Sequence, residues 1–330
     1  MASFTVKTKA LCIIGTLAMA ALAVASLFVG KYPLSLRELI AGNELHWRVF
    51  WTLRVGRTLV GAVGGFALGM AGFVYQTVFR NPLASPDIIG VSSGASAGAA
   101  AGILLFSGAG AVTISSFAGA LFAVVIVLGL SSLDRTGKKS TIVLSGIAVH
   151  SLAQTVLMGL KLTADPEREL ASIEYWIMGS LSGISVYSIG GNILLCILAL
   201  GILFPLHRQI ILLSGAEGEA RMLGVSVGKL RLFVLLAATL AVSAVVSLTG
   251  LISFTGLLAP HGARLMTKDN RPGTMLLSGL LGGILLMGAD ILARSVAASE
   301  LPISIFTSLL GAPFLLILIL KPALKSQEGD

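Results

Sequence analysis

The sequence predicts an all-α polytopic membrane protein with about ten transmembrane helices. The chain has 330 residues, of which 55% are hydrophobic and only 12% are charged, and its mean hydropathy is +0.95. Soluble domains carry about 25% charged residues, so this composition excludes an ordinary globular domain. Long uncharged stretches alternate with short polar segments. We therefore expect a single transmembrane domain over residues 1–330.

The first uncharged stretch, residues 10–30, follows two lysines and ends near small residues, as a signal peptide would. It is nevertheless as long as a full span, about 20 residues, and further spans follow, so we expect a retained first helix. Five other stretches each have the length of one crossing. They are residues 58–79, 140–160, 186–206, 273–289 with an extension to about 296, and 301–320.

Two further stretches do not read as a single crossing. Residues 88–132 are too long for one span, and Ser107-Gly108-Ala109-Gly110 offers the turn of a tight hairpin. Residues 232–263 form either one long span or two short spans that meet near Gly250. Counting two helices in each stretch gives ten spans, and nine spans are the alternative.

The basic residues indicate the orientation of the chain. Ten spans place both termini on one side, and the C-terminal tail carries Lys321 and Lys325. With that side cytoplasmic, 15 of the 23 lysines and arginines lie inside, in agreement with the positive-inside bias. The net charge of +8 is scattered between apolar spans and forms no stripe, so we expect no nucleic-acid partner.

A polar turn broken by two prolines lies between two apolar stretches, within residues 72–95. Pro82 and Pro86 end the preceding helix, because proline lacks an amide donor and restricts the residue before it. Its polar side chains would be costly in hydrocarbon, so the turn must lie at a membrane face or against protein. We expect the chain to contact a partner there. These side chains are Arg80, Asn81, Ser85 and Asp87.

Glycines recur at four-residue spacing in two predicted spans. On a helix this spacing makes a flat stripe that lets two backbones approach closely. Packing within one subunit and packing between subunits both fit the pattern. The stripes are Gly61, Gly65 and Gly69, and Gly94, Gly98 and Gly102.

Motifs for catalysis or cofactor binding are lacking. The segment DRTGKKST, residues 134–141, fails the phosphate-binding pattern, because a second lysine stands where Ser or Thr is required and no strand precedes it. The four histidines show no metal-ligand spacing. We expect no enzyme activity, no metal and no cofactor in this chain.

Two groups of charged residues near predicted spans each have two interpretations. Asp290 and Arg294 stand four apart, and so form either a functional intramembrane pair or a plain ion pair near a helix end. Arg48, Arg54 and Arg57 precede the second span on the predicted outer side. They form either an interfacial belt with neighbouring tryptophans or an electropositive patch for an acidic partner.

A set of short motifs also occurs along the chain. It comprises Arg54-x-x-Arg57; Gly72, Gln76, Arg80-Asn81-Pro82-Leu83-Ala84, Pro86, Gly90 and Gly94-Ala95; Trp176-x-x-Gly179-Ser180; Ala220-x-x-Leu223-Gly224; Phe254-x-Gly256-Leu257; Pro260-His261-x-x-Arg264; Asp290-x-x-x-Arg294; Glu300-Leu301-Pro302; and Gly311-Ala312-Pro313-Phe314. In this order and at these intervals, the chain resembles the permease subunit of ABC importers for iron–siderophore complexes, haem and cobalamin. The resemblance covers nearly the whole chain and implies the type II importer fold.

Three positions depart from the family pattern. Gly56 stands where a proline is usual, Gly262 replaces an aliphatic residue, and Ser304 replaces a glycine. We expect local changes in stiffness and no change of fold.

The resemblance implies a machine in the cytoplasmic membrane of a bacterium or archaeon. Two permease subunits, expected to be identical, would enclose a pathway in the lipid bilayer, and an extracytoplasmic binding protein would deliver the substrate. Two ATPase subunits would bind the cytoplasmic face and hold the ATP and magnesium. The cargo would be an iron chelate, with an iron–siderophore complex first and haem or cobalamin next.

The resemblance also assigns roles to particular residues. Arg54, Arg57 and Arg294 would engage the binding protein, and Ser140 with Thr141 would form the inner gate. A polar segment at about 214–230 would couple to the ATPase subunits, through Glu219, Ala220, Leu223 and Gly224. Further family motifs lie in turns, at Arg80, Asn81, Pro82, Pro86, Pro260, His261 and Arg264.

The competing class is a secondary transporter driven by an ion gradient, in which Asp290 would carry a proton or sodium ion. A lone carboxylate paired with an arginine suits that role poorly.

Overall fold

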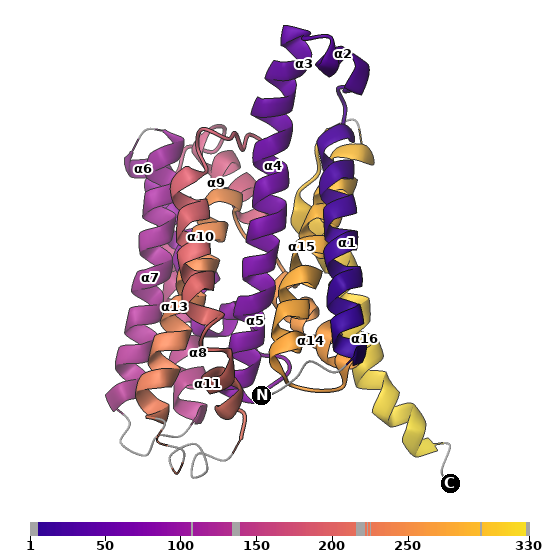
Figure 1. The fold of residues 1–330 in the computed structure, drawn as a ribbon. Coiled ribbons are helices and arrows are strands. Elements are labelled where there is room, and N and C mark those ends of the chain that lie inside the picture. The colour runs from indigo at the N-terminus through magenta and orange to yellow at the C-terminus, as the bar shows by residue number, and fades with distance from the viewer. Residues whose placement is uncertain are drawn as a thin grey trace.

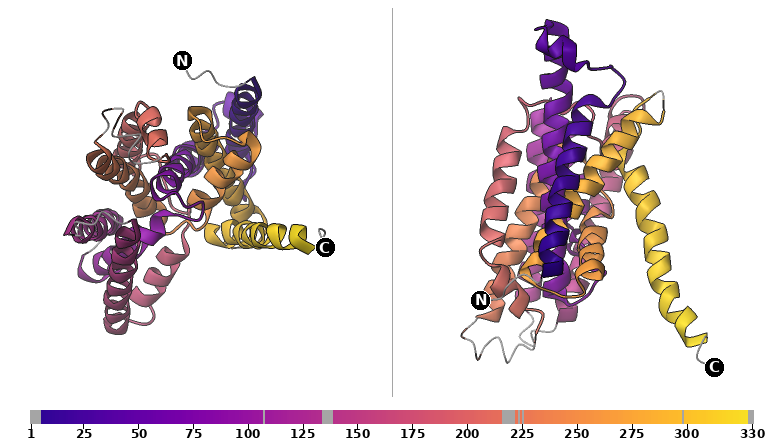
Figure 2. Two further views of the ribbon diagram at one scale, coloured as in Figure 1. Left: turned by 90° about the horizontal axis from the view of Figure 1, so that it is seen from below. Right: turned by 45° about the vertical axis from the view of Figure 1, so that its right-hand side comes forward.

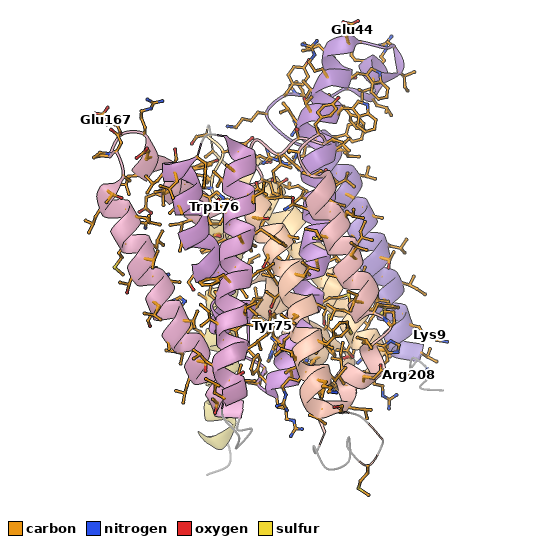
Figure 3. All side chains as sticks on the ribbon, turned by 90° about the vertical axis from the view of Figure 1, so that its left-hand side faces the viewer. Lys9, Glu44, Tyr75, Glu167, Trp176 and Arg208 are labelled. Atoms are coloured by element: carbon orange, nitrogen blue, oxygen red, sulfur yellow. The ribbon has the colours of Figure 1, made fainter. Side chains whose placement is uncertain are left out.

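The computed structural model describes residues 6–106, 108–133, 139–215, 222, 224, 226–297 and 299–327. The described residues are almost entirely helical and include no strand. The helices form an elongated bundle (Figure 1), with Lys9 and Arg208 at one end and Glu44 and Glu167 at the other (Figure 3). We call these the inner and outer ends, after the orientation that the basic residues predict.

The described elements follow the predicted order along the chain. Short 3₁₀ or π-helical segments carry the label η. The elements are α1 (Val6–Phe28), α2 (Leu36–Ile40), α3 (Glu44–Val49), η1 (Phe50–Val55), α4 (Gly56–Leu59), η2 (Val60–Gly64), α5 (Gly65–Phe79), η3 (Pro86–Ile89), α6 (Val91–Leu105), α7 (Ala109–Leu133), α8 (Lys139–Thr163), α9 (Glu169–Met178), α10 (Gly190–Leu203), α11 (His207–Leu212), α13 (Val227–Thr249), α14 (Thr255–Thr267), α15 (Pro272–Ser295) and α16 (Ile303–Gln327).

The number of membrane-crossing helices agrees with the prediction of about ten. Within the described part of the chain, six helices are long and apolar enough to cross a membrane, and three shorter ones are apolar. The 13-residue α14 is shorter again. The hairpin predicted within residues 88–132 is confirmed as α6 and α7, and the stretch 232–263 divides into α13 and α14.

The second span is longer than predicted, because helical structure starts at Glu44 rather than near residue 58. Asn43 caps its first turn, accepting hydrogen bonds from the backbone amides of Leu45 and His46 at 3.1 and 3.4 Å. No proline interrupts the segment that follows, which carries Arg48, Arg54 and Arg57, so the helix continues through it. Together, α2 and α3 project beyond the outer end of the bundle (Figure 1).

The core lies around α5, which contacts α13, α14 and α15. In the most apolar 18-residue stretch of the span Glu44–Phe79, 78% of the residues are buried, whereas the corresponding share in α1, at the edge of the bundle, is 17%. Polar contacts also occur in this core, because the Tyr75 hydroxyl lies 2.7 Å from that of Thr239 on α13. A buried hydroxyl pair of this kind satisfies both groups where no water is available.

The glycine stripes pack within the subunit. A Cβ atom at Gly65 would lie 2.5 Å from the carbonyl oxygen of Gly282 on α15. A Cβ atom at Gly98 would lie 2.2 Å from the carbonyl oxygen of Ser115 on α7. The two backbones can approach this closely only without side chains, so the interpretation as packing within one subunit is confirmed.

Candidate functional site

Five charged residues meet at the outer end, and we call them the outer charge cluster: Arg54, Arg57, Asp290, Arg294 and Glu300. The predicted pair on α15 is present, with Arg294 3.0 Å from Asp290. Arg57 joins it from α4, donating to Asp290 at 2.8 Å and to both carboxylate oxygens of Glu300 at 3.0 Å. Ion pairs therefore join residues that are far apart in the sequence.

The outer charge cluster also holds α1. Arg294 donates to the carbonyl and hydroxyl oxygens of Ser26 at 3.0 and 2.6 Å. Arg54, in the π-helical turn η1, donates to the carbonyl oxygens of Val29 and Tyr32 at 2.8 and 2.9 Å. The cluster thus connects α1, the second span, α15 and the segment before α16 to one another at the outer end of the bundle.

The three arginines predicted to engage a binding protein are buried in this conformation. Arg54, Arg57 and Arg294 are 5%, 7% and 1% exposed. Their guanidinium groups are occupied by partners within the chain, so direct docking through them stays a prediction. Arg37 and Arg48, on the projecting α2 and α3, are exposed at the same end, as is Arg168 just before α9.

A second junction at the outer end joins the Trp176-x-x-Gly179-Ser180 motif to the break that follows α13. Gly179 and Gly250 have φ angles of +72° and +69°, and a Cβ atom on Gly250 would lie 2.0 Å from the carbonyl oxygen of Trp176. The backbone amide of Ser180 donates to the carbonyl oxygen of Thr249 at 2.7 Å. Trp176 lies near the outer end (Figure 3). Glycine is needed at both positions because other residues rarely adopt such angles.

One departure from the family pattern has a visible consequence at this junction. The Ser304 hydroxyl, where glycine is usual, donates to the carbonyl oxygen of Leu251 at 2.8 Å. The substitution therefore adds a link between α16 and the break that follows α13.

At the inner end, Arg264 of α14 braces the end of α5. It donates to the side chains of Gln76 and Thr77, the latter at 3.0 Å, and to Asn270 at 3.1 Å. Its guanidinium carbon also lies 4.6 Å from the centre of the Phe73 ring. These partners are neutral, so none of them supplies a counter-ion for the positive charge of Arg264.

The proline-broken turn contacts the chain itself through Arg80, its residues 80–83 are exposed, and the contact with a partner stays a prediction. Arg80 ends α5 in a left-handed conformation, with φ of 50°, and donates to the carbonyl oxygens of Leu213 at 3.1 Å and of Gly215. The Asn81 side chain accepts from the backbone amide of Leu83 at 2.9 Å. Pro82 is exposed, whereas Pro86 is buried and begins η3.

The second family turn lies within α14. Pro260 is buried inside that helix. The His261 ring packs edge-to-face on Phe314 of α16, with 5.5 Å between the ring centres. His261 therefore serves packing here, and the described residues contain no group of three metal-ligating side chains.

The predicted coupling and gate residues are only partly described. Glu219, Ala220 and Leu223 lie outside the described residues. Gly224 is exposed, has a φ of +77°, and would have no atom of the described residues within 4 Å of an added Cβ. Ser140 and Thr141 lie in the first turn of α8, where Thr141 is half-buried. Both roles stay predictions.

Sequence reasoning missed Ser26 and Gln76 as partners of the arginines. Ser26 is 268 residues from Arg294, and Gln76 is 188 residues from Arg264. Gln76 was visible as a motif residue, but no sequence signal connected it with Arg264.

Comparison with known proteins agrees with this geometry. Residues 17–321 match the FecCD transport family. The cobalamin import permease of Halobacterium salinarum is 34% identical over 81% of this chain and 72% of its own length. The Fe(3+) dicitrate transport permease of Escherichia coli is 34% identical over 94% of this chain and 98% of its own. A solved structure assigned as an inward-facing, metal-chelate type ABC transporter gives a TM-score of 0.86 at 30% identity, covering 94% of this chain and 98% of that one.

Proposed function

Because the chain belongs to the FecCD transport family, we propose that it carries an iron chelate through the inner membrane. The chain is a multi-pass permease subunit of an ABC importer, and ATP is hydrolysed by a separate subunit. The observation that carries the proposal is the family match over residues 17–321. Relatives named for cobalamin and for ferric dicitrate leave the cargo to be identified, and we favour an iron–siderophore complex over haem and cobalamin.

We further propose that two copies of the chain form the pathway. Two helices present largely apolar, exposed faces: Leu152 on α8 is 66% exposed and Leu309 on α16 is 68% exposed. In both views of Figure 2, α16 leans away from the other helices. Faces of this kind are covered by lipid or by a second subunit. Single cysteines along α8 and α16 should cross-link two copies, and the absence of any cross-link would contradict the homodimer.

The ion-gradient alternative has little support from the charges around Asp290. Its carboxylate lies within 3.0 Å of both Arg57 and Arg294 and is 1% exposed. Both arginines already pair with this carboxylate, so Asp290 is poorly placed to bind and release a transported ion.

The energy source and cargo can be tested in one reconstitution. Proteoliposomes would contain the chain with its ATPase subunit, and the binding protein would be added outside with a ferric hydroxamate, haem or cobalamin. We expect vanadate-sensitive uptake of the ferric hydroxamate that a protonophore leaves unchanged, and no ATP hydrolysis by the permease chain alone. Uptake that needs a proton gradient and no ATP would overturn the importer mechanism. ATP-driven uptake of cobalamin alone would overturn only the cargo.

The proposed roles at the two ends belong to the same machine. The segment at about 214–230 would transmit ATPase closure, because a partner can shift a conformation only through contacts that differ between states. Ser140 and Thr141 would close the inner gate. At the outer end, the acidic lobes of a binding protein would meet the exposed Arg37 and Arg48 first, with the outer charge cluster beneath them.

A further inference from the structure

A cavity of about 240 Å³, with four polar residues in a largely apolar lining, opens where η3 leads into α6 and where α14 begins. We call it the polar cavity, and its polar lining residues are Ser85, Asp87, Ser92 and Ser253. Its remaining lining is apolar and comes chiefly from α13 and the start of α14. Asp87 is the only charged residue in this described lining.

Helix lengths place the polar cavity near the middle of the membrane. α6 has 15 residues and its antiparallel partner α7 has 25, and a turn joins them at the outer end. At a rise of 1.5 Å per residue, α6 therefore starts about 15 Å short of the inner end of α7. The 13-residue α14 ends at Thr267 on the inner side, so its first residue lies about 20 Å from that end. The hydrocarbon core is about 30 Å thick, so both starts lie well inside it.

Asp87 is solvent-exposed in the single subunit although it lies at this depth. Its carboxylate accepts hydrogen bonds from the hydroxyl groups of Ser92 and of Ser85, the latter at 3.4 Å. No arginine or lysine among the described residues forms an ion pair with it, in contrast to Asp290. A carboxylate exposed to lipid is very costly, and of the two alternatives, the bundle interior and a water-filled space, the exposure of Asp87 fits the second.

The surroundings of Asp87 connect it with the proposed subunit interface. η3 packs against α8, and His150 on α8 is close enough to interact electrostatically with the carboxylate. α8 is also one of the two helices whose exposed apolar faces we assign to the second copy.

Phe254, which lines the same cavity, has a φ of +63°, a strained angle for an aromatic residue.

We propose that the polar cavity is part of the translocation pathway. Asp87 there attracts cationic or hydrogen-bond-donating groups of the cargo and disfavours anionic groups. Two copies would place one such carboxylate on each side of the pathway. This inference rests on the proposed function, because that function supplies the pathway between two subunits. It narrows the cargo to neutral or cationic chelates.

The test measures the local electrostatic field without any cargo. Ser253→Cys would be introduced into the full chain with Cys12 and Cys196 changed to alanine, and reconstituted into liposomes. Its reaction rates with a cationic and an anionic methanethiosulfonate of similar size would be compared, each divided by the rate with a free thiol. We expect the cationic reagent to be favoured about tenfold, as a nearby unit charge predicts at intermediate dielectric.

Changes at Asp87 decide whether that preference comes from its charge. Asp87→Asn should remove the preference and Asp87→Glu should retain it. The matched control is Ser188→Cys, exposed at the outer end, whose preference should be the same with and without Asp87→Asn. A cysteine at position 253 that reacts with neither reagent, or a preference that survives Asp87→Asn, would overturn the proposal.

A second measurement needs no change at Asp87, and so holds even where Asp87→Asn fails to fold. Raising the salt from 0.01 M to 1 M shortens the Debye length from about 30 Å to about 3 Å, and should reduce the preference of the Ser253→Cys variant severalfold. A preference independent of salt would contradict an electrostatic origin. Because the labelling requires neither ATP nor cargo, its failure is distinguishable from failure of the importer reconstitution.

Discussion

The two ends of the molecule hold their arginines in different ways. In the outer charge cluster, Arg57 and Arg294 lie against the carboxylates of Asp290 and Glu300. At the inner end, Arg264 is held by two amide side chains, a hydroxyl group and an aromatic face. Separating buried ions leaves an uncompensated charge, whereas neutral acceptors can be exchanged for water at lower cost. We therefore expect the outer end to be the rigid one and the inner end, which the ATPase subunits contact, to rearrange.

The largest effect should follow from removing the central carboxylate of the outer charge cluster. Asp290→Ala leaves Arg57 and Arg294 buried without their shared counter-ion, and breaking a buried pair in this way costs about 3–5 kcal/mol. Thermal unfolding of the purified subunit in detergent would measure the loss.

The control is an ion pair that lies at the surface. Lys161 and Glu174 are 2.9 Å apart, with side chains 27% and 46% exposed. Glu174→Ala should cost no more than about 1 kcal/mol, because solvent screens the pair. If Asp290→Ala and Glu174→Ala lowered the free energy of unfolding equally, burial would not set the strength of the outer charge cluster.

The next largest effect is expected from the inner arginine. Arg264→Met keeps most of the side-chain volume but leaves Gln76, Thr77 and Asn270 without their donor. Because these acceptors are neutral, the loss should be about 1–3 kcal/mol, below that of Asp290→Ala. Arg264→Lys keeps the charge but cannot reach all three acceptors, and its loss should fall between those of the natural chain and Arg264→Met. If Arg264→Met lowered the free energy of unfolding as much as Asp290→Ala, the ionic contacts of the outer end would be no stronger than the neutral contacts of the inner end.

Local patterns predicted the helices and the short-range contacts of this fold. The hairpin of α6 and α7 follows from the length of one apolar stretch and its glycine-rich turn. The Asp290–Arg294 pair follows from helical spacing. The extension of the second span to Glu44 was missed, because charge marks the edge of the membrane and does not end a helix.

Long-range partners could not be predicted in the same way. Arg57 and Asp290 are 233 residues apart, and their contact depends on how α4 and α15 pack. An arginine next to a predicted membrane surface is compatible with docking and with burial, and sequence alone cannot decide between them. The buried environment of Arg54, Arg57 and Arg294 therefore had to come from the structure.

A smaller effect is expected at Gly224, in the segment proposed to couple to the ATPase. Its φ of +77° is disfavoured for other residues, and an added Cβ would touch none of the described residues. Gly224→Ala should therefore cost about 1–2 kcal/mol through backbone strain alone.

Coupling at Gly224 can be separated from stability by a second variant. Gly224→Glu should be about as stable as Gly224→Ala but should hydrolyse ATP without moving cargo in the reconstituted complex. Normal transport per ATP in Gly224→Glu would refute the coupling role. General misfolding of both variants would instead assign Gly224 to ending a helix.

The smallest effect should come from Glu300, at the solvent edge of the outer charge cluster. Its side chain is 27% exposed, and Arg57 keeps Asp290 as a partner when Glu300 is removed. Glu300→Gln should therefore cost about 0.5–1 kcal/mol near neutral pH. Partial burial alone would raise the pKa of Glu300, but the hydrogen bonds and charge of Arg57 outweigh it and lower the pKa below its usual value.

The lowered pKa of Glu300 fixes the direction of its pH dependence. The stabilisation is fully present above the unfolded-state pKa of about 4.3, and is lost as the pH falls through the lower pKa of the folded state. The difference in unfolding free energy between the natural chain and Glu300→Gln should therefore be constant from neutral pH to about pH 5 and shrink below it. A difference that grows on acidification would mean that Glu300 is protonated in the folded chain. Its bond to Arg57 would then not be the ionic contact that separates the outer end from the inner one.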